Sequence, residues 1–395
     1  MSGSARPVSS LRVGLASAED PTSAGYSSGT PRSLWRALGE VVGEAVPVGG
    51  ELPPRLKRLA VTAGQLQGIR SLSTARSDMR AAQARARLRL PLTAARSAAV
   101  GVRMLRRHPI DLCVQHGAEY VVPLPVPYVT FEDSTFAQAY RAYPWPHLEG
   151  ITHRDLHSLQ RRQRRLYRRA AACCTMSHWA AQSIIADYAI DAEQVHVVGV
   201  GPNHTFERPA TRAWWPPRFL FVGMDWTRKN GARVVEAFQA VRKSHPSATL
   251  DVVGRHPKLG HENVREHGVL SLDTPAERDS LGGLFQRATV LVAPSLHDPS
   301  PVVHVEAGTA GIGSIGTRNG GAATLVGTGG ILVDPLDQEA LTRGMLAMCD
   351  PVIAREAGEN AYELSRELTW RKVAERLVRA GRLDNLDESQ LAGFL

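Results

Sequence analysis

The feature that most constrains this fold is the regular alternation of short apolar runs with longer helical segments in the C-terminal half of the chain. Such alternation is typical of a parallel, doubly wound sheet, in which ligands bind at the carboxyl ends of the strands. The expected strands are Phe219–Gly223, Thr249–Gly254, Val269–Leu272, Thr289–Pro294, Gly313–Gly316 and Ile331–Val333. Helices are expected over 230–244, 275–287 and 337–349.

The N-terminal half carries a looser version of the same pattern. We expect strands at Leu11–Ala16, Ile110–Val114, Pro127–Phe131 and Val195–Val200. Helices are expected over 31–44, over 55–108 with an interruption at Pro91, over 155–173 and from near Ser177.

The length of 395 residues suggests two domains, because single hydrophobic cores stop growing below that size. The segment Arg208–Arg218 holds three prolines and no periodicity, which is typical of a linker. We therefore predict an α/β fold with two Rossmann-like, doubly wound domains facing a cleft. Their expected extents are 1–207 and 208–372, followed by a helical tail over 373–395 that could cross back to the N-terminal domain.

The composition predicts a cytoplasmic protein. No apolar run approaches the ~20 residues that cross a bilayer. The first ten residues lack the apolar segment of a secretory signal. The four cysteines, Cys113, Cys173, Cys174 and Cys349, show no metal-ligand spacing, so we expect a reduced protein with no metal site.

The positive charge is unevenly distributed. The net charge is +9, and the basic residues from Arg55 to Arg107 are opposed by the single carboxylate Asp78. A second basic cluster lies between Arg161 and Arg169. Such blocks suit an anionic partner, such as the inner face of a membrane, or they form a solvated arginine-rich helix face. No nucleic-acid-binding motif accompanies them, so we expect no nucleic-acid partner.

Two cations follow the first expected strand of the C-terminal half. Gly223 ends that strand, and Arg228 and Lys229 lie in the loop before the next helix. Cations at the carboxyl end of a strand and beside a helix N-terminus favour phosphate binding. Exposed loop cations without a ligand are the alternative.

Two carboxylates follow another strand, Thr289–Pro294. Asp298 lies in the loop, and Glu306 lies about two turns into a helix expected to begin near Ser300. The free N–H groups of that helix would attract an anion. A carboxylate inside an otherwise apolar helix is costly unless it is hydrogen-bonded, which makes Glu306 a candidate ligand-binding residue; Asp298 could instead cap its own helix.

These residues resemble the motifs of the retaining GT-B glycosyltransferases of family 4, also called group 1. The similarity covers most of residues 10–375 and is strongest from 219 to 335. It implies that Lys229 binds the donor phosphate, that Asp298 contacts the donor sugar and that Glu306 binds the ribose. It also implies that the backbone amides of Val302 and Val303 meet the diphosphate and sugar, and that Asn319-Gly-Gly321 matches the family's small-residue turn.

The sequence departs from the family pattern at three places. Met224 stands where the family has an arginine, so Arg228 is expected to supply that charge. Asp298 is one methylene shorter than the usual glutamate, and Ser300-Pro301 replaces Phe-Gly. The shorter carboxylate could change which sugar is accepted or reduce turnover.

The N-terminal half contains weaker matches to the same family. Gly25–Pro31 resembles its flexible glycine loop, with Gly29 as a donor-binding candidate. Phe131–Phe136 resembles an Asp-x-Thr-Phe motif, which makes Asp133 a catalytic candidate, with Glu132 second; capping of the following helix is the equal alternative for Asp133. His116 is a weak candidate, and Trp179 is expected to pack in a core.

The resemblance implies a retaining, metal-independent glycosyltransferase with no cofactor other than its nucleotide-diphosphate-sugar substrate. The N-terminal domain would take an unidentified acceptor and the C-terminal domain the nucleotide-sugar. Lys229 and Arg228 would stabilise the leaving diphosphate, with Asp133 and Asp298 as the other catalytic candidates. A nucleotide-sugar epimerase or hydrolase on the same fold, and a catalytically weak binding protein, are the alternatives.

Overall fold

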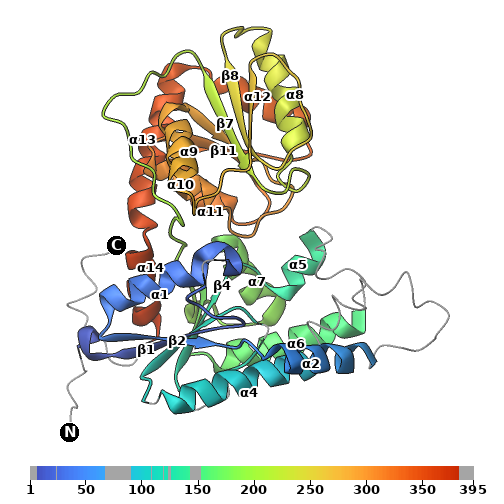
Figure 1. Cartoon of the computed structure of the whole chain (residues 1–395), viewed down its shortest axis with the longest axis vertical. Helices are drawn as coiled ribbons and strands as arrows, with labels where there is room; N and C mark the ends of the chain where they lie inside the picture. Colours follow the sequence, from blue (N-terminus) through green and yellow to red (C-terminus); the bar gives the residue numbers. More distant parts are fainter. Residues whose placement is uncertain are drawn as a thin grey trace, which may run out of the picture. The chain divides into compact units, whose positions relative to one another are not determined.

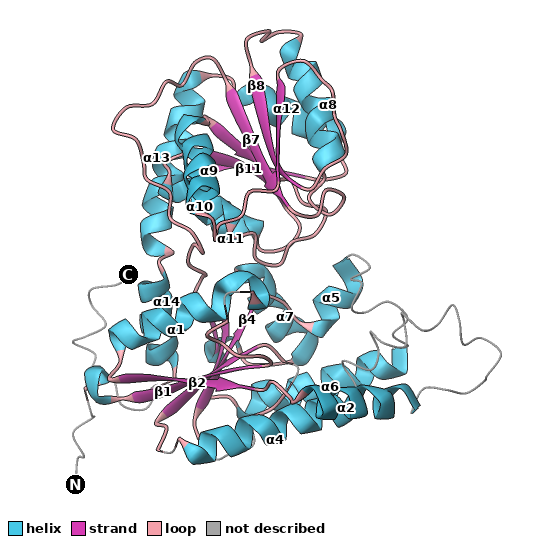
Figure 2. Cartoon of the chain, viewed as in Figure 1, coloured by secondary structure: helices cyan, strands magenta, loops and turns pink. Residues whose placement is uncertain are grey.

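The computed structural model describes residues 7–23, 25–66, 90–107, 109–118, 120–122, 126–142 and 153–381. The chain forms two compact units. The N-terminal unit comprises the described residues up to Met176, Ala180–Val198 and the residues from Trp370 onward; the C-terminal unit comprises Ser177–Trp179 and Gly199–Thr369. Within the described residues each unit holds one six-stranded parallel sheet flanked by helices (Figure 1, Figure 2). The predicted α/β class with two Rossmann-like domains is therefore confirmed.

The sheet of the N-terminal unit has the order β2-β1-β3-β4-β5-β6. All neighbouring strands pair in parallel. The strands are β1 (Arg12–Ser17), β2 (Glu44–Gly49), β3 (Leu112–His116), β4 (Tyr128–Glu132), β5 (Ala172–Thr175) and β6 (Val195–Val197). The chain winds outward from β1 to β2 and then returns to the other side of β1, as a doubly wound sheet does.

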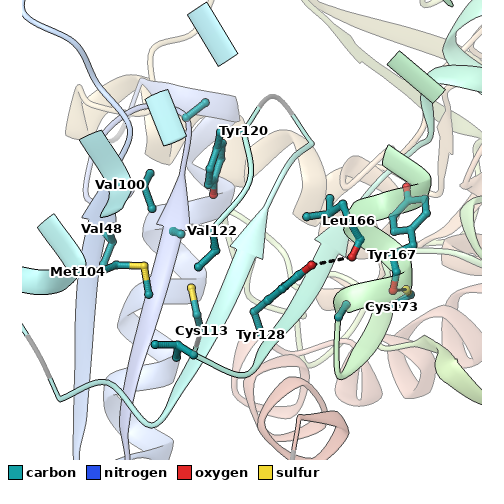
Figure 3. Packing of buried hydrophobic residues seen from close by; sticks show 14 of the residues in the cluster. Val48, Val100, Met104, Cys113, Tyr120, Val122, Tyr128, Leu166, Tyr167 and Cys173 are labelled. Atoms are coloured by element: carbon teal, nitrogen blue, oxygen red, sulfur yellow. Dashed lines mark hydrogen bonds between the residues drawn. The ribbon is translucent and has the colours of Figure 1, made fainter. Parts of the chain in front are cut away.

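Helices of the N-terminal unit flank this sheet (Figure 2). They are α1 (Thr30–Val41), α2 (Pro54–Leu66), α4 (Leu90–Arg106), α5 (Phe136–Ala142), α6 (His153–Arg169), most of α7 (His178–Tyr188) and α14 (Trp370–Ala380). Short 3₁₀ turns occupy Val8–Ser10, Tyr26–Gly29 and Ala192–Gln194. Val100 and Met104 of α4 and Leu166 of α6 reach the same core cluster, where the hydroxyl of Tyr128 donates to the Leu166 carbonyl at 2.7 Å (Figure 3).

The sheet of the C-terminal unit has the order β12-β11-β10-β7-β8-β9, again with parallel pairs throughout. Its strands are β7 (Arg218–Gly223), β8 (Thr249–Gly254), β9 (Val264–Gly268), β10 (Val290–Val292), β11 (Gly313–Thr317) and β12 (Gly330–Val333). Its helices are α8 (Gly231–Arg242), α9 (Pro275–Arg287), α10 (Val303–Thr309), α11 (Ala322–Val326), α12 (Gln338–Ala347) and α13 (Pro351–Glu367). The order reverses between β7 and β10, which places a topological switch point at those two strands.

Several expected elements differ from the structure. The expected strand Val269–Leu272 is wrong, because β9 is the preceding, mostly polar Val264–Gly268. An edge strand pairs on one side only, so it needs no continuous apolar run. The expected helix over 155–173 is wrong at its end, because α6 stops at Arg169 and Ala172–Thr175 form the buried strand β5. Strand β2 was not predicted.

The segment expected as one helix over 55–108 contains α2 and α4, and residues 67–89 lie outside the described residues. Pro91 is the second residue of α4, a position that tolerates proline because the N–H of the first turn has no intrahelical partner. In the described parts of the chain, no helix has the length and apolar character needed to cross a membrane.

The observed unit boundaries also differ from the expected ones. Residues from Gly199 already belong to the C-terminal unit, where Phe206 stacks on Phe285 with ring centroids 4.0 Å apart. The chain returns to the N-terminal unit at Trp370, and α14 packs there against α1.

Candidate active site

The candidate site of the C-terminal unit lies at its switch point. The loop after β7 carries Arg228 and Lys229, and the loop after β10 carries Asp298. Because β7 and β10 are adjacent and parallel, both loops leave the same edge of the sheet. This edge is where an open α/β sheet binds its ligand.

The two cations converge on one carboxylate. Lys229 Nζ lies 2.5 Å from Asp298 Oδ2, and Arg228 Nη1 lies 3.2 Å from the same oxygen. Only 12% of the Lys229 side chain and 11% of the Asp298 side chain are exposed. Burial alone would raise the pKa of Asp298, but the charges of Lys229 and Arg228 outweigh it and hold that pKa below its ordinary value. Asp298 is therefore a nearly buried anion held between two cations.

The β7–α8 loop is fixed by its own hydrogen bonds. The Asp225 carboxylate accepts from the Arg228 N–H at 3.0 Å, and the Asp225 carbonyl accepts from the Lys229 N–H at 2.9 Å. Asn230 adopts a left-handed conformation just before α8. The Leu296 N–H donates to the Arg228 carbonyl at 2.8 Å, which ties this loop to the loop that carries Asp298. These hydrogen bonds thus fix the backbone positions from which the Arg228 and Lys229 side chains extend.

Glycine is required beneath Lys229. A Cβ on Gly223 would lie 2.9 Å from Lys229 Cγ. Gly254, at the end of the neighbouring strand β8, has a φ of +116°, and a Cβ there would lie 1.8 Å from the Gly223 carbonyl oxygen. The predicted site residue Gly223 is thus placed directly against Lys229 by the structure.

The Asn319-Gly-Gly321 turn supports the Asp298 loop. The Gly321 N–H donates to the Asp298 carbonyl at 3.1 Å. Gly320 has a φ of +87°, and a Cβ there would lie 2.1 Å from that same carbonyl oxygen. The turn can therefore approach the loop this closely only because it lacks side chains.

Replacing Gly320 by alanine is expected to displace Asp298 and to destabilise the chain by about 2 kcal/mol more than the same change at Gly260, because both glycines have left-handed backbones but only the Cβ at Gly320 would meet the Asp298 carbonyl oxygen. Chemical denaturation measures the loss. The control is Gly260→Ala, which has a φ of +63° and nothing within 4 Å of its Cβ. If both variants bind ligands of the site like the parent chain, the contact between Gly320 and Asp298 does not position the carboxylate.

Glu306 lies in the first turn of a short helix. Helix α10 begins at Val303, with Val302 as its N-cap, so the expected start near Ser300 and the depth of two turns are wrong. Pro299 and Pro301 flank Ser300, and the residue before a proline is disfavoured in helical conformation. The predicted residues Val302 and Val303 therefore mark the amino end of α10.

The Glu306 carboxylate is bound by backbone. Its Oε1 accepts from the His204 N–H at 3.2 Å. Burial raises the pKa of Glu306 to about 7, against the opposing effects of that hydrogen bond and of the Lys229 charge. The Glu306 carboxyl group therefore gains and loses its proton near neutral pH. The charge of Lys229 is near enough to favour its ionised form.

Glu306→Gln is expected to change how stability depends on pH. In the unfolded chain Glu306 ionises near its usual pKa of about 4.3, whereas the folded chain keeps its proton to about pH 7. Folding therefore favours the protonated form, and wild-type stability declines relative to the glutamine variant as pH rises from about 4.3 to 7. Melting temperatures of both proteins at matched pH values measure this, and a constant difference would contradict the raised pKa.

Two histidines near the cluster were not predicted. His297 precedes Asp298, its carbonyl accepts from Arg228 Nη1 at 3.0 Å, and its ring meets that of Trp179 at 5.9 Å between centroids. His304 is buried in α10 against Gly316 of β11, and burial lowers its pKa to about 3, so it is neutral. The sequence gives no functional signal for His304, because it lies between two valines. His297 could have been found, because it is the neighbour of the predicted site residue Asp298.

The remaining predicted residues belong to the N-terminal unit. Gly29 has a φ of +82° and precedes α1. Asp133 follows β4 and accepts from the Ser134 hydroxyl at 2.8 Å. Glu132 is buried, where it accepts from the Tyr167 hydroxyl at 2.6 Å and from Gln163 Nε2 at 3.0 Å. The roles of Gly29 and Asp133 stay predictions.

His116 is buried at the end of β3, between Tyr26 and Phe131. Burial lowers its pKa to about 4, so the ring is neutral. The role of His116 stays a prediction.

Known proteins resemble the chain in sequence and fold. The family model described as "Glycosyl transferases group 1" matches residues 216–350. The MMP alpha-(1->4)-mannosyltransferase of Mycolicibacterium hassiacum is 25% identical over 225 residues, which cover 55% of each protein. The glycogen synthase of Mycobacterium tuberculosis is 27% identical over 168 residues, 40% of this chain and 41% of the relative. The chain thus spans about half the length of the curated relatives it matches.

Solved structures show the same fold over nearly the whole chain. A sucrose-phosphate synthase from Thermosynechococcus elongatus has a TM-score of 0.61 at 16% identity, covering 94% of this chain and 98% of its own. A glycosyltransferase from Rickettsia africae has a TM-score of 0.60 at 14% identity, covering 95% and 100%. These likenesses show the two-domain GT-B fold. The part of the chain that matches the group 1 glycosyltransferase family, residues 216–350, holds Arg228, Lys229, Asp298 and Glu306.

Proposed function

We propose that the chain transfers a sugar from a nucleoside-diphosphate sugar to an acceptor hydroxyl, with retention of the anomeric configuration. The observation that carries this proposal is the anionic oxygen of Asp298, held at 2.5 Å from Lys229 and 3.2 Å from Arg228. A diphosphate oxygen is also an anion with this hydrogen-bonding chemistry, so the same two cations can bind it. The names of the curated relatives favour a hexose donor and a glycan acceptor.

In the proposed reaction the bond from the anomeric carbon to the diphosphate oxygen breaks, and a bond from the acceptor oxygen to that carbon forms on the same face. The acceptor proton passes to the leaving diphosphate. Lys229 and Arg228 stabilise the negative charge that develops on the departing group, which is the role a divalent cation would otherwise fill. Asp298 accepts hydrogen bonds from the donor sugar once the diphosphate has taken its place on the cations, and Glu306 accepts from the ribose.

A screen of nucleoside-diphosphate sugars tests this function. A donor at 100 times its dissociation constant adds about 2.7 kcal/mol of stability, which thermal shift detects readily. With the donor identified, release of the nucleoside diphosphate is followed with candidate glycan acceptors, and proton NMR of the fresh product gives its anomeric configuration. A product of inverted configuration would refute retention.

Other outcomes favour the alternatives. Turnover of the donor without any acceptor would indicate an epimerase or a hydrolase. Failure to bind every nucleoside-diphosphate sugar would indicate a binding protein that lacks the transfer activity. The metal-independent character is tested separately, since full turnover in the presence of EDTA is expected and its abolition would contradict it.

A further inference from the structure

Helices α2 and α4 of the N-terminal unit have solvent faces that their amphipathic packing does not explain. Val100 and Met104 of α4 point into the core (Figure 3), so the opposite side of this helix should be polar. Instead its exposed positions include Ala94, Ala98, Val102 and Leu105. Val102 is 49% exposed and Leu105 is 61% exposed. The solvent face of α4 is therefore largely apolar.

Helix α2 adds two more exposed leucines. Leu56 is 53% exposed and Leu59 is 66% exposed, and the two lie one turn apart. Helices α2 and α4 contact each other, and they lie side by side in Figure 1. Four of the large exposed apolar side chains of the described residues thus lie on two neighbouring helices.

The charges that α2 and α4 themselves carry are all positive. Neither α2 nor α4 contains an aspartate or glutamate. Some of the cations are neutralised from elsewhere, since Glu19 pairs with Lys57 and Arg96, and Glu51 pairs with Arg103. Arg55, Arg58 and Arg106 are exposed and form no ion pair with another described residue. These three arginines with Leu56, Leu59, Val102 and Leu105 are called the α2–α4 surface below.

We propose that the α2–α4 surface docks on an anionic lipid bilayer. The boundary of such a bilayer offers both a negative potential for arginines and acyl chains for leucine and valine side chains. A nucleic-acid backbone would satisfy the cations and leave the apolar side chains without partners. A symmetric contact with a second copy would place the same unopposed arginines face to face, and like charges across an interface repel.

The test measures partitioning of the full chain to vesicles. Binding is expected to vesicles of equimolar phosphatidylcholine and phosphatidylglycerol, to weaken with added salt, and to be absent with phosphatidylcholine alone. The pair Arg55→Gln and Arg58→Gln is expected to weaken partitioning about 30-fold, which corresponds to about 1 kcal/mol per arginine. The pair Leu56→Ser and Leu59→Ser is expected to weaken it at least about ten-fold at all salt concentrations.

Matched variants in the C-terminal unit serve as controls. Arg343→Gln with Arg355→Gln removes two exposed arginines, and Val352→Ser with Ile353→Ser removes two apolar side chains that are 53% and 42% exposed. Both controls are expected to partition like the wild type, and unchanged melting temperatures show that all variants fold. Equal losses in the controls, equal binding to neutral vesicles, or tighter binding to duplex RNA than to anionic vesicles would each overturn the proposal. A concentration-dependent dimer that the leucine variants abolish would also overturn it, in favour of a second copy.

Discussion

Replacing Lys229 by methionine is expected to lower kcat of sugar transfer by about two to three orders of magnitude while the fold is kept. Lys229 holds its ammonium group 2.5 Å from the anion at the switch point, so its charge acts where the proposed leaving group departs. Loss of one fixed donor to a developing anion costs about this much in other enzymes. Steady-state turnover with the donor found by screening measures the effect.

The control for this substitution is Lys243→Met. Lys243 is an exposed lysine of the same unit at the end of α8, so the variant removes an equal charge away from the site. Its turnover is expected to match the wild type. Turnover of Lys229→Met within a few-fold of the wild type would show that the cation does not act in the reaction.

Replacing Asp298 by alanine is expected to destabilise the ligand-free chain by about 3 kcal/mol, because it leaves Lys229 nearly buried without its carboxylate. Arg228 is more exposed and retains water, which limits the loss. The same variant is expected to gain more stability from inorganic pyrophosphate than the wild type does, since no carboxylate competes for the cations. Denaturation with and without pyrophosphate measures both effects.

The double variant Lys229→Met with Asp298→Ala tests whether the unpaired Lys229 charge causes the loss of stability in Asp298→Ala. Removing both charges leaves no buried, unpaired ion, so the double variant is expected to be more stable than Asp298→Ala alone. A double variant whose loss equals the sum of the two single losses would show that the pair is not coupled.

The sequence was sufficient to predict the β7–α8 and β10–α10 loops as parts of one site. Parallel strands end at a common edge, so Arg228, Lys229 and Asp298 could be grouped without knowing any distance. The central strands β7 and β10 were predicted for a different reason, because they are mostly apolar runs buried on both faces of the sheet. The edge strand β9 was missed because a strand with one exposed side can be polar.

Other features depend on contacts between distant segments and could not be predicted. The left-handed Gly320 next to Asp298 and the hydrogen bond from His204 to Glu306 join residues far apart in the chain. The neutral, buried His304 has no local signal, because a histidine among valines has the same sequence pattern on a surface or in a core. The late start of helix α10 is different, because Pro299 and Pro301 constrain the backbone locally and the sequence alone could have shown it.

Arg228 and Lys229 together are expected to bind the diphosphate of a nucleotide-sugar. Calorimetric titration of UDP, GDP and ADP into the wild type and into Arg228→Gln with Lys229→Met tests it directly. The wild type is expected to bind at least one of these nucleotides, and the double variant to bind that nucleotide at least about a hundred-fold more weakly, since charge-assisted hydrogen bonds are worth about 1.5–3 kcal/mol each. Equal affinity in the two proteins, with both correctly folded, would contradict the account.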